Sequence, residues 1–399
     1  MRNGLNNQRV RHHNKTVLMA LLYRQKVASK SALARQSQLS IPAVSKILDD
    51  LLSEGRIVWH KTNLHQRGLS GGSYQVAPDN VHILCMNITP YRIESIVVDS
   101  LIRPQNEFET LSIKIKTPDE LLQHIEQIYH QCYARRRLPL KLALSVHGQV
   151  NPISGVSQKM PQAPWSGTIE FKYLLESRLN TDVMLDNDCI MLALAEKWQN
   201  ASSQQDFCVI NVDYGIGSSF VINQQIYRGS LYGSGQIGHT IIDPDGSACS
   251  CGRYGCLETI ASLSALKRKV RMMLKIQSHL DEHEWAELTT EQLINLYQQN
   301  NDAVRALVIQ AAQAIGLSLY NFLNTLNINR IHLYGRSCQF GDEWFNTILN
   351  QIGISPFDQT ERADFQATQI MLGQLTRQQQ VMGIGYLFVE KALKEINES

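Results

Sequence analysis

The sequence predicts an α/β protein in which an N-terminal winged helix-turn-helix module precedes a two-lobed body. The first 75 residues are basic and carry three short helical patterns followed by two strand patterns. Strand and helix patterns then alternate, which is typical of α/β lobes. One histidine and three cysteines close together indicate a metal site. The expected domains are residues 1–79 for the module, residues 80–198 with 378–399 for the first lobe, and residues 199–377 for the second lobe with the metal site.

The composition is that of a soluble, cytoplasmic protein. The chain has 399 residues, of which 43% are hydrophobic and 19% charged, enough for two or three domains with cores of their own. No run of eighteen apolar residues occurs, so we expect no membrane insertion. The N-terminus is polar and basic, unlike a signal peptide. The cysteines outside the metal cluster are scattered, and we expect them to be reduced.

Charge is distributed unevenly along the chain. Residues 1–75 contain twelve Lys and Arg and three acids, a net charge of +9, so the rest of a chain with net charge +2 carries −7. A basic module on an acidic body indicates a polyanionic partner for the module alone.

The helices of the module have recognisable ends. Apolar side chains on one face of residues 14–25 predict the first helix. Ser29 is a suitable N-cap for the second helix. Ser40 is the N-cap of a third helix with Pro42 in its first turn, where the missing N–H does no harm. Gly55 ends this third helix.

The third helix is the candidate recognition helix. The side expected to face the core carries Ile41, Val44, Ile47, Leu48 and Leu51. The opposite side presents small and polar residues, as suits a helix that enters the major groove. We predict that this helix contacts DNA through Ser40, Ala43, Ser45 and Lys46. A small helical docking domain is the alternative interpretation.

Two strand patterns, at 56–59 and 74–76, predict the β-hairpin wing. The basic, Gly-rich segment 65–72 between them would form its tip. Arg67 in this tip is expected to reach a phosphate or the minor groove. Together with the recognition helix, the wing predicts binding to double-stranded DNA.

The body continues as alternating strands and helices. Strands are predicted at 81–88, 93–101, 140–148, 182–188, 207–215, 218–227 and 330–335, and helices at 118–137, 190–200, 259–276, 302–327 and 378–396. The last helix is expected to return to the first lobe.

The metal site depends on the spacing H-x9-C-x-C-x4-C. Its candidate ligands are His239, Cys249, Cys251 and Cys256. One imidazole and three thiolates can surround a Zn²⁺ ion tetrahedrally and leave no position open, which is typical of a structural site. Buried free thiols or disulfides are the alternatives. Cys-x-Cys is a poor disulfide spacing and the chain shows no export signal, so we favour one structural zinc ion per chain.

Two segments resemble signatures of the ROK family (repressors, open reading frames, kinases). GQIGHT at 235–240 is similar to the family's E-I-G-H motif, and CSCGRYGCLETIAS at 249–262 is similar to its C-x-C-G-x-x-G-C-L-E motif. The resemblance covers essentially the full length, and a winged helix before a sugar-kinase-like body matches the Mlc/NagC-type regulators. It implies an actin-like, RNase H-like two-lobed fold, the zinc ion, and a sugar or sugar phosphate bound between the lobes.

The resemblance also implies which residues bind the effector. Family kinases hold sugar hydroxyls with residues similar to Asn187 and Asp188, the carboxylate acting as general base on the attacked hydroxyl. Gln236 stands where the family has Glu. The expected effector-binding residues are Gly148, Asn187, Asp188, Gln236, His239 and Glu258. The alternative for Asn187, Asp188 and Glu258 is a remnant hydrogen-bond network that holds the lobes together.

The nucleotide site departs from the family pattern. Kinases of the family begin the first lobe with a D-x-G-G-T-like turn that handles Mg²⁺ and phosphate. The matching segment here is Asn87–Tyr91, in which an amide replaces the acid and Pro90 has no N–H to donate. Segment 213–219 keeps two glycines, and segment 333–337 keeps only Gly335. We therefore expect no kinase activity and assign no catalytic residue.

These observations predict a transcriptional repressor of carbohydrate uptake or metabolism genes, controlled by a sugar or sugar phosphate. Two alternatives remain: a ROK sugar kinase with an added DNA-binding module, and a regulator sequestered by the cytoplasmic domain of a sugar transporter. Recognition of an inverted-repeat operator requires two modules, so we expect a homodimer or a dimer of dimers.

Overall fold

Two compact units make up the protein. The structure, a computed structural model, describes residues 7–61, 72–78, 81–113, 115–136, 138–199, 205–278, 288–353 and 368–398. One unit comprises Met1–Ala201 and Thr376–Ser399, and holds the N-terminal module with the first lobe. The other comprises Ser202–Leu375 and is the second lobe. The expected lobe boundaries, at 198 and 378, lie within three residues of these positions.

The N-terminal module is a winged helix-turn-helix, as predicted. Its helices are α1 (Asn7–Gln25), α2 (Lys30–Ser37) and α3 (Ile41–Ser53), and its sheet has the order β1 (Ala28–Ser29), β3 (Ser73–Val76) and β2 (Ile57–His60). The Ser29 side chain accepts a hydrogen bond from the Ala32 N–H, and the Ser40 side chain accepts one from the Ala43 N–H. Both predicted N-caps are therefore present.

Two details of the module differ from the prediction. α1 begins at Asn7 and not at residue 14, because its polar first turns are held by ion pairs to α3 that apolar periodicity does not reveal. These pairs join Arg11 to Asp50, and Lys15 to Glu54, the C-cap residue of α3. Ile41, expected to face the core, is 56% exposed, because the first turn of α3 extends beyond the module's core.

The first lobe is built on a five-stranded sheet with the order β10-β7-β4-β5-β6. The strands are β4 (His82–Thr89), β5 (Arg92–Asp99), β6 (Glu109–Ser112), β7 (Leu140–Val146) and β10 (Val183–Asn187). β4, β7 and β10 are parallel, whereas β5 and β6 join in antiparallel fashion. Near-continuous burial along the central strands indicates that both faces of the sheet are covered.

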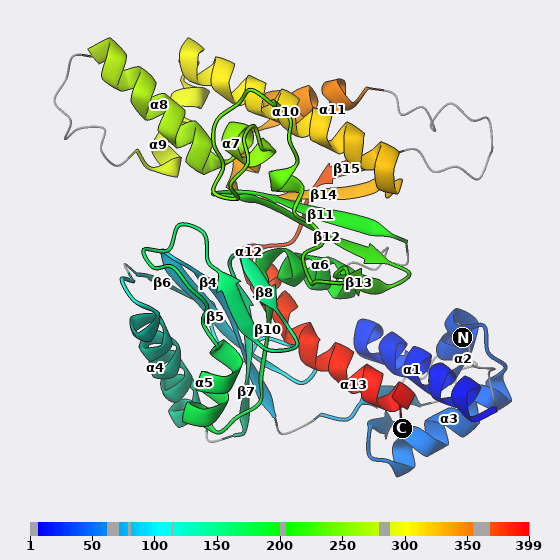
Figure 1. Cartoon of the computed structure of the whole chain (residues 1–399). Coiled ribbons are helices and arrows are strands. Elements are labelled where there is room, and N and C mark those ends of the chain that lie inside the picture. The colour runs from blue at the N-terminus through cyan, green and yellow to red at the C-terminus, as the bar shows by residue number, and fades with distance from the viewer. Residues whose placement is uncertain are drawn as a thin grey trace. The chain divides into compact units, whose positions relative to one another are not determined.

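Different helices cover the two faces of this sheet (Figure 1). α4 (Pro118–Arg136) and α5 (Phe171–Leu179) pack on Leu84, Met86 and Ile88 of β4. α6 (Asp188–Gln199) and the C-terminal segment lie on the other face, where Cys85 approaches Gly385. A hairpin of β8 (Gln149–Asn151) and β9 (Val156–Lys159) follows β7.

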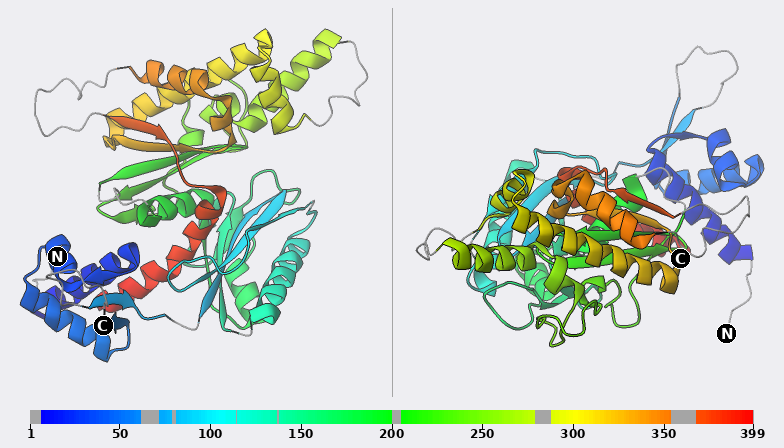
Figure 2. Two further views of the ribbon diagram at one scale, coloured as in Figure 1. Left: turned by 180° about the vertical axis from the view of Figure 1, so that it is seen from behind. Right: turned by 90° about the horizontal axis from the view of Figure 1, so that it is seen from above.

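The predicted closing helix 378–396 is divided into two. α12 (Arg377–Met382) runs into the 3-10 turn η3 (Gly383–Gly385), and α13 (Tyr386–Glu398) follows. The break presses Gly383 against α6, where any side chain would collide with the Met191 carbonyl. α13 then lies alongside α1 of the module (Figures 1 and 2). The C-terminal helix thus belongs to the first lobe and touches the DNA-binding module within one unit.

The second lobe repeats the plan of a five-stranded mixed sheet, with the order β13-β12-β11-β14-β15. Its strands are β11 (Phe207–Val212), β12 (Ile216–Ile222), β13 (Gln225–Tyr227), β14 (Arg330–Tyr334) and β15 (Gln369–Leu372). Its helical segments are η1 (Ile237–His239), α7 (Leu257–Ala261), α8 (Leu263–Ser278), α9 (Thr290–Gln298), α10 (Asp302–Leu326), η2 (Arg336–Phe340) and α11 (Asp342–Ile352). Sequence periodicity predicts one helix at 259–276, where the structure has α7 and α8, and it predicts neither α9 nor α11.

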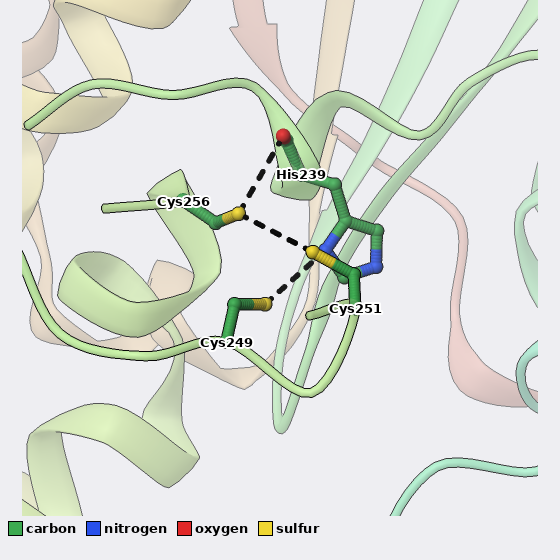
Figure 3. A group of neighbouring side chains, drawn as sticks. All are labelled: His239, Cys249, Cys251 and Cys256. Atoms are coloured by element: carbon green, nitrogen blue, oxygen red, sulfur yellow. Dashed lines mark hydrogen bonds between the residues drawn. The ribbon is translucent and has the colours of Figure 1, made fainter. Parts of the chain in front are cut away.

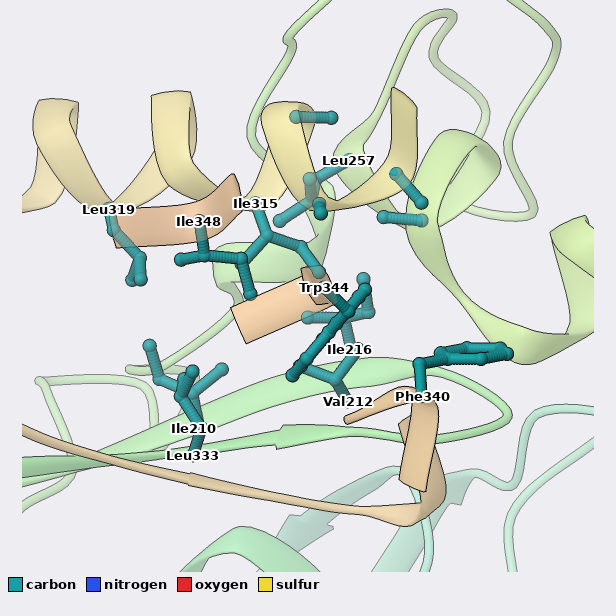
Figure 4. Close-up of a cluster of buried hydrophobic side chains, with 14 of the residues drawn as sticks. Ile210, Val212, Ile216, Leu257, Ile315, Leu319, Leu333, Phe340, Trp344 and Ile348 are labelled. Atoms are coloured by element: carbon teal, nitrogen blue, oxygen red, sulfur yellow. The ribbon is translucent and has the colours of Figure 1, made fainter. Parts of the chain in front are cut away.

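α10 is the central core helix of the second lobe. Within the described ranges it is the one helix long and apolar enough to cross a membrane, yet half of its apolar window is buried inside the protein. Ile315 and Leu319 of α10 lie in one cluster with Trp344 and Ile348 of α11 and with Ile210 of β11 (Figure 4). Its apolar composition is accounted for by this packing.

Candidate functional site

The four predicted metal ligands converge in the second lobe (Figure 3). Their donor atoms all lie within 4.8 Å of one another. The Cys249 Sγ is 3.5 Å from the His239 Nδ1, and the Cys251 Sγ is 3.6 Å from the Cys256 Sγ. Around a tetrahedral Zn²⁺ with bonds of about 2.0–2.3 Å, a sulfur and a nitrogen are about 3.5 Å apart and two sulfurs about 3.8 Å apart. The cluster therefore fits a tetrahedral zinc ion.

Tight turns bring the ligands together. Gly255 (φ +68°) lies so close to the Asp243 carbonyl that any side chain would collide with it. The Cys249 N–H donates to the Arg253 carbonyl over 2.7 Å, and the Gly252 N–H donates to the Cys249 carbonyl over 3.0 Å. These two bonds close a turn around residues 249–253, and this turn presents both of its thiols to His239.

The environments of the thiols also suit a cation. Burial, reinforced by the neighbouring Cys251 and Cys249 thiols, raises the pKa of Cys256 to about 12. The N–H of Arg253 instead lowers the pKa of the exposed Cys251 thiol. A buried thiol of this kind ionises readily only when a positive charge replaces the lost solvation. Zn²⁺ among the four donors would supply that charge.

A second group of predicted residues lies at the carboxyl end of the parallel strands of the first lobe. Asn187 is the last residue of β10, Asp188 is the first of α6, and Gly148 lies just beyond β7. The His147 Nδ1 lies 2.9 Å from the Asp188 Oδ2, and both side chains are less than one-fifth exposed. Ligands of α/β proteins commonly bind at this end of parallel strands.

Local packing of the chain requires glycine at position 148. Its φ of +101° is in the region that favours glycine, and a side chain there would collide with the Lys159 carbonyl and with Pro161. The β8–β9 hairpin therefore closes over this position. Gly148 is one of the expected effector-binding residues, and the close approach that the structure describes at this position is that of the chain itself.

The remaining predicted effector residues, Gln236, His239 and Glu258, lie in the second lobe. Gln236 is exposed at the N-cap of η1 and makes no side-chain cap bond. His239 faces Cys249 with its Nδ1, which leaves Nε2 as the nitrogen that can meet a ligand. The Glu258 Oε2 accepts a hydrogen bond from the Ile216 N–H over 3.0 Å, which ties α7 to the start of β12.

Asn87, the first residue of the expected phosphate turn, uses both polar atoms of its side chain in a buried hydrogen-bond network. It is 1% exposed; its Nδ2 donates to the Glu94 carboxylate over 2.8 Å, and its Oδ1 accepts from the Ser145 hydroxyl over 2.7 Å. Arg377 of α12 donates to Glu94 in turn over 2.7 Å. Burial favours a higher pKa for Glu94, but the Arg377 hydrogen bonds and charge outweigh it and hold that pKa below its ordinary value.

In segment 213–219, the second segment compared with the phosphate-binding turns of the family, Asp213 and Tyr214 are likewise engaged by another side chain of the protein. Arg336, from η2, makes a bidentate ion pair with Asp213. Its Nη2 donates to Oδ1 over 2.7 Å, and its Nε lies 3.0 Å from Oδ1 and 3.2 Å from Oδ2. The Arg336 guanidinium also stacks 4.2 Å from the centre of the Tyr214 ring. Burial favours a higher pKa for Asp213, but Arg336 outweighs it and holds the carboxyl pKa below its ordinary value.

The predicted DNA-contacting residues lie at the N-terminal end of α3: Ser40 is its N-cap, and Ala43, Ser45 and Lys46 are in its first two turns. Ser40 and Lys46 are exposed, whereas Ala43 and Ser45 are half-buried. The Lys30 Nζ donates to the Ser45 hydroxyl over 2.9 Å, so α2 and α3 present a joint polar surface. Arg67 lies outside the described residues.

The structure shows contacts of three further side chains that the sequence did not predict: His147, Arg336 and Arg377. His147 carried a weak signal: segment 145–155, SVHGQVNPISG, resembles a glycine-rich segment of the ROK family in which proline is usual at this position. Arg336 and Arg377 carried none, because their carboxylate partners lie 123 and 283 residues away in the chain. A lone arginine in a sequence does not indicate its partner.

Comparison with known proteins identifies relatives along almost the whole chain. A model described as the ROK family matches residues 85–391. The chain is 58% identical over 399 residues to the uncharacterised protein YphH of Escherichia coli K12, covering 99% of this chain and 100% of that protein. It is 24% identical to the xylose repressor of Caldicellulosiruptor bescii, covering 85% of this chain and 87% of that one. It is 25% identical to the DNA-binding transcriptional dual regulator NagC of Escherichia coli K12, covering 82% and 81%.

Solved structures show the same fold. A ROK family transcriptional regulator, a homologue of the Escherichia coli MLC protein, superposes with a TM-score of 0.75 at 21% identity and covers 98% of this chain and 100% of its own. A ROK hexokinase from Thermus thermophilus has a TM-score of 0.61 at 20% identity and covers 78% of this chain and 99% of its own. The predicted fold, a winged helix-turn-helix before a sugar-kinase-like body, is confirmed.

Proposed function

The chain belongs to the ROK family, and from this premise we propose that it is a transcriptional repressor that binds operator DNA and responds to a sugar or sugar phosphate. One observation carries the proposal: a winged helix-turn-helix, formed by the basic N-terminal segment, precedes the ROK body in one chain. The regulator structure matches this whole arrangement, whereas the hexokinase accounts for 78% of the chain. The relatives named as repressors support the same assignment.

The proposed DNA contacts are those of α3 and the wing. Lys46 would meet a phosphate, and Ser40, Ala43 and Ser45 would lie against base edges or sugars of the major groove. Arg67 is retained as the contact of the wing tip on sequence grounds. Operator binding by a pair of modules requires at least a homodimer, and such a regulator acts in the cytoplasm.

The proposed effector contacts are Asn187 and Asp188 of the first lobe, with Gly148 beside them, and Gln236, His239 and Glu258 of the second. Carboxylate, amide and imidazole groups accept and donate the hydrogen bonds that sugar hydroxyls require. A sugar that binds one conformation of the body more tightly shifts the population away from the form that binds DNA. His239 would serve both the metal site and the sugar site.

Replacing Asp188 with alanine is expected to abolish the response to sugar. Wild-type protein should bind a duplex from its own promoter about tenfold more weakly in the presence of the effective sugar, and in the variant this ratio should fall to about one. Fluorescence anisotropy against glucose, N-acetylglucosamine, xylose and their phosphates measures the ratio. A retained tenfold ratio in the variant would assign Asp188 to a structural network.

We propose in addition that His239, Cys249, Cys251 and Cys256 hold one structural Zn²⁺ ion. The separations of the donor atoms and the buried Cys256 thiol support this assignment. When bound, the ion would fix η1 to the N-terminus of α7 and so set the positions of His239 and Glu258.

We propose, finally, that the protein does not phosphorylate sugars. Asn87 lacks the charge needed for Mg²⁺ and is bonded on both sides, and Arg336 neutralises Asp213. We expect turnover of ATP with glucose, N-acetylglucosamine or xylose to remain at least about a thousandfold below that of a ROK hexokinase assayed in parallel. Release of ADP measures it. Turnover that disappears in the Asp188→Ala variant would instead identify a kinase.

A further inference from the structure

Helix α6 connects the proposed effector site to the vicinity of the DNA-binding module. Its first residue is Asp188, the proposed effector contact, and its last turn carries Trp198. The helix rises about 1.5 Å per residue, so these two residues are about 15 Å apart along its axis. All ten residues from Cys189 to Trp198 are buried, including Glu196 and Lys197. A helix buried on every side moves as one body with its neighbours.

The N-terminal end of α6 is anchored through Asp188. Its Oδ2 is paired with the His147 Nδ1 at 2.9 Å, and its Oδ1 accepts from the Cys189 N–H at 3.1 Å. The Asn187 Oδ1 also accepts from the Ile190 N–H at 2.8 Å, which caps the first turn. A sugar hydroxyl that approaches Asp188 therefore competes with His147 for the same carboxylate oxygen, and any adjustment acts on the first turn of α6.

The C-terminal end of α6 is packed against the DNA-binding module. The Trp198 indole stacks on Tyr386 of α13 with 5.4 Å between ring centres, and Tyr23 of α1 meets it edge-on at 6.3 Å. The Arg24 guanidinium, also from α1, lies 5.5 Å from the centre of the indole ring. The Trp198 Nε1–H donates to Glu390 of α13 over 2.9 Å. One side chain of α6 thus touches both the module and the C-terminal helix.

Other contacts prevent α6 from sliding independently. Lys197 forms an ion pair with Glu390, and the Gln199 side chain donates to the Gln379 carbonyl of α12 over 2.8 Å. Gly383 lies against the α6 backbone with no room for a side chain. These contacts tie α6 to α12 and α13 along its length, so they offer a continuous packed connection from Asp188 to Trp198.

We propose that α6 is the element that transmits effector occupancy to the DNA-binding module, with His147 and Trp198 as its two positioning residues. This inference rests on the proposed function. In the absence of sugar, the His147–Asp188 pair sets the position of the helix, and Trp198 holds the end of α1. When a hydroxyl replaces His147 on Asp188, α6 shifts, the Trp198 contact with Tyr23 and Arg24 is altered, and the orientation of α1 changes.

Hydrogen–deuterium exchange on the full chain tests the coupling without any sugar. The probe is the amide exchange of residues 16–25, the C-terminal half of α1, in which Tyr23 and Arg24 contact Trp198. The variants are His147→Ala, Trp198→Leu and the double variant. We expect His147→Ala to change exchange in this segment by about threefold, and we expect that effect to vanish in the Trp198→Leu background.

Two further variants separate coupling from general damage. His147→Asn keeps an N–H donor where the Nδ1 stands, and should restore wild-type exchange in α1. Tyr129→Phe removes a buried hydrogen bond of the same lobe, from the Tyr129 hydroxyl to the Leu140 carbonyl, and should leave α1 unchanged. Unchanged α1 exchange in His147→Ala, or effects of the two single substitutions that simply add in the double variant, would overturn the proposal.

The same variants distinguish failure of this inference from failure of the proposed function. If wild-type protein does not bind duplexes from its own promoter, the repressor assignment fails, whatever the exchange data show. If wild-type protein binds and releases DNA in response to one of the tested sugars, Trp198→Leu should still bind that sugar by calorimetry but lose the roughly tenfold change in operator affinity. Retention of the full change would exclude α6 as the transmitting element.

Discussion

Replacing Cys251 with serine is expected to strip zinc from the protein and to lower the melting temperature of the second lobe by about 10 °C. Cys251 is exposed, so the substitution removes a ligand and almost no packing. The remaining three donors leave an incomplete shell, and a structural zinc site loses most of its affinity with one thiolate. The loop that connects η1 to α7 then lacks its crosslink, and His239 and Glu258 lose their fixed positions.

Metal analysis of the purified protein and calorimetric melting measure both effects. Cys338→Ser is the matched control, since Cys338 lies in the same lobe, is half-buried and is not part of the cluster. It should retain one zinc ion per chain. A Cys251→Ser protein with full zinc content and wild-type melting would show that the four side chains are not the ligand set.

The second large effect is expected on operator affinity. Lys46→Glu should weaken binding to promoter DNA by about a hundredfold, because it removes one phosphate contact and adds a repulsive charge on the exposed side of α3. Lys46→Ala should lower the affinity for promoter DNA by about tenfold and reduce the slope of log affinity against log salt by about one. The loss should be similar for all sequences tested, because a phosphate contact carries no base information.

Anisotropy titrations between about 50 and 200 mM salt measure these effects. Arg268→Ala is the control: it removes an exposed positive charge from α8 of the second lobe and should leave the affinity and the salt slope unchanged. Wild-type affinity and slope in Lys46→Ala would place α3 outside the DNA interface.

Features set by neighbouring residues in the chain were predictable. The N-caps Ser29 and Ser40 were identified because a serine oxygen bonds to an N–H three residues later, inside the same short segment. The four metal donors were identified because they lie within eighteen consecutive residues and their chemistry is distinctive. Most strands of the two central sheets followed from their apolar runs, but the edge strands β6 and β15 were not predicted.

Features set by tertiary packing were not predictable. The apolar periodicity of 378–396 continues through Gly383, so a single helix was predicted, and only the approach of α6 explains the break. The start of α1 at Asn7 depends on ion pairs with α3. The roles of His147 and Arg377 depend on carboxylates that the fold brings close. Sequence periodicity records which face is buried, but it does not record which neighbour buries it.

The buried Asn87–Glu94–Arg377 network makes the amide at position 87 a structural requirement of the first lobe. Asn87→Asp would put a second carboxylate where the amide now donates to Glu94 over 2.8 Å. Two anions so close in a buried site repel by several kcal/mol, or one of them must take up a proton. The substitution alone is therefore expected to destabilise the first lobe, whatever chemistry a carboxylate at this position could otherwise provide.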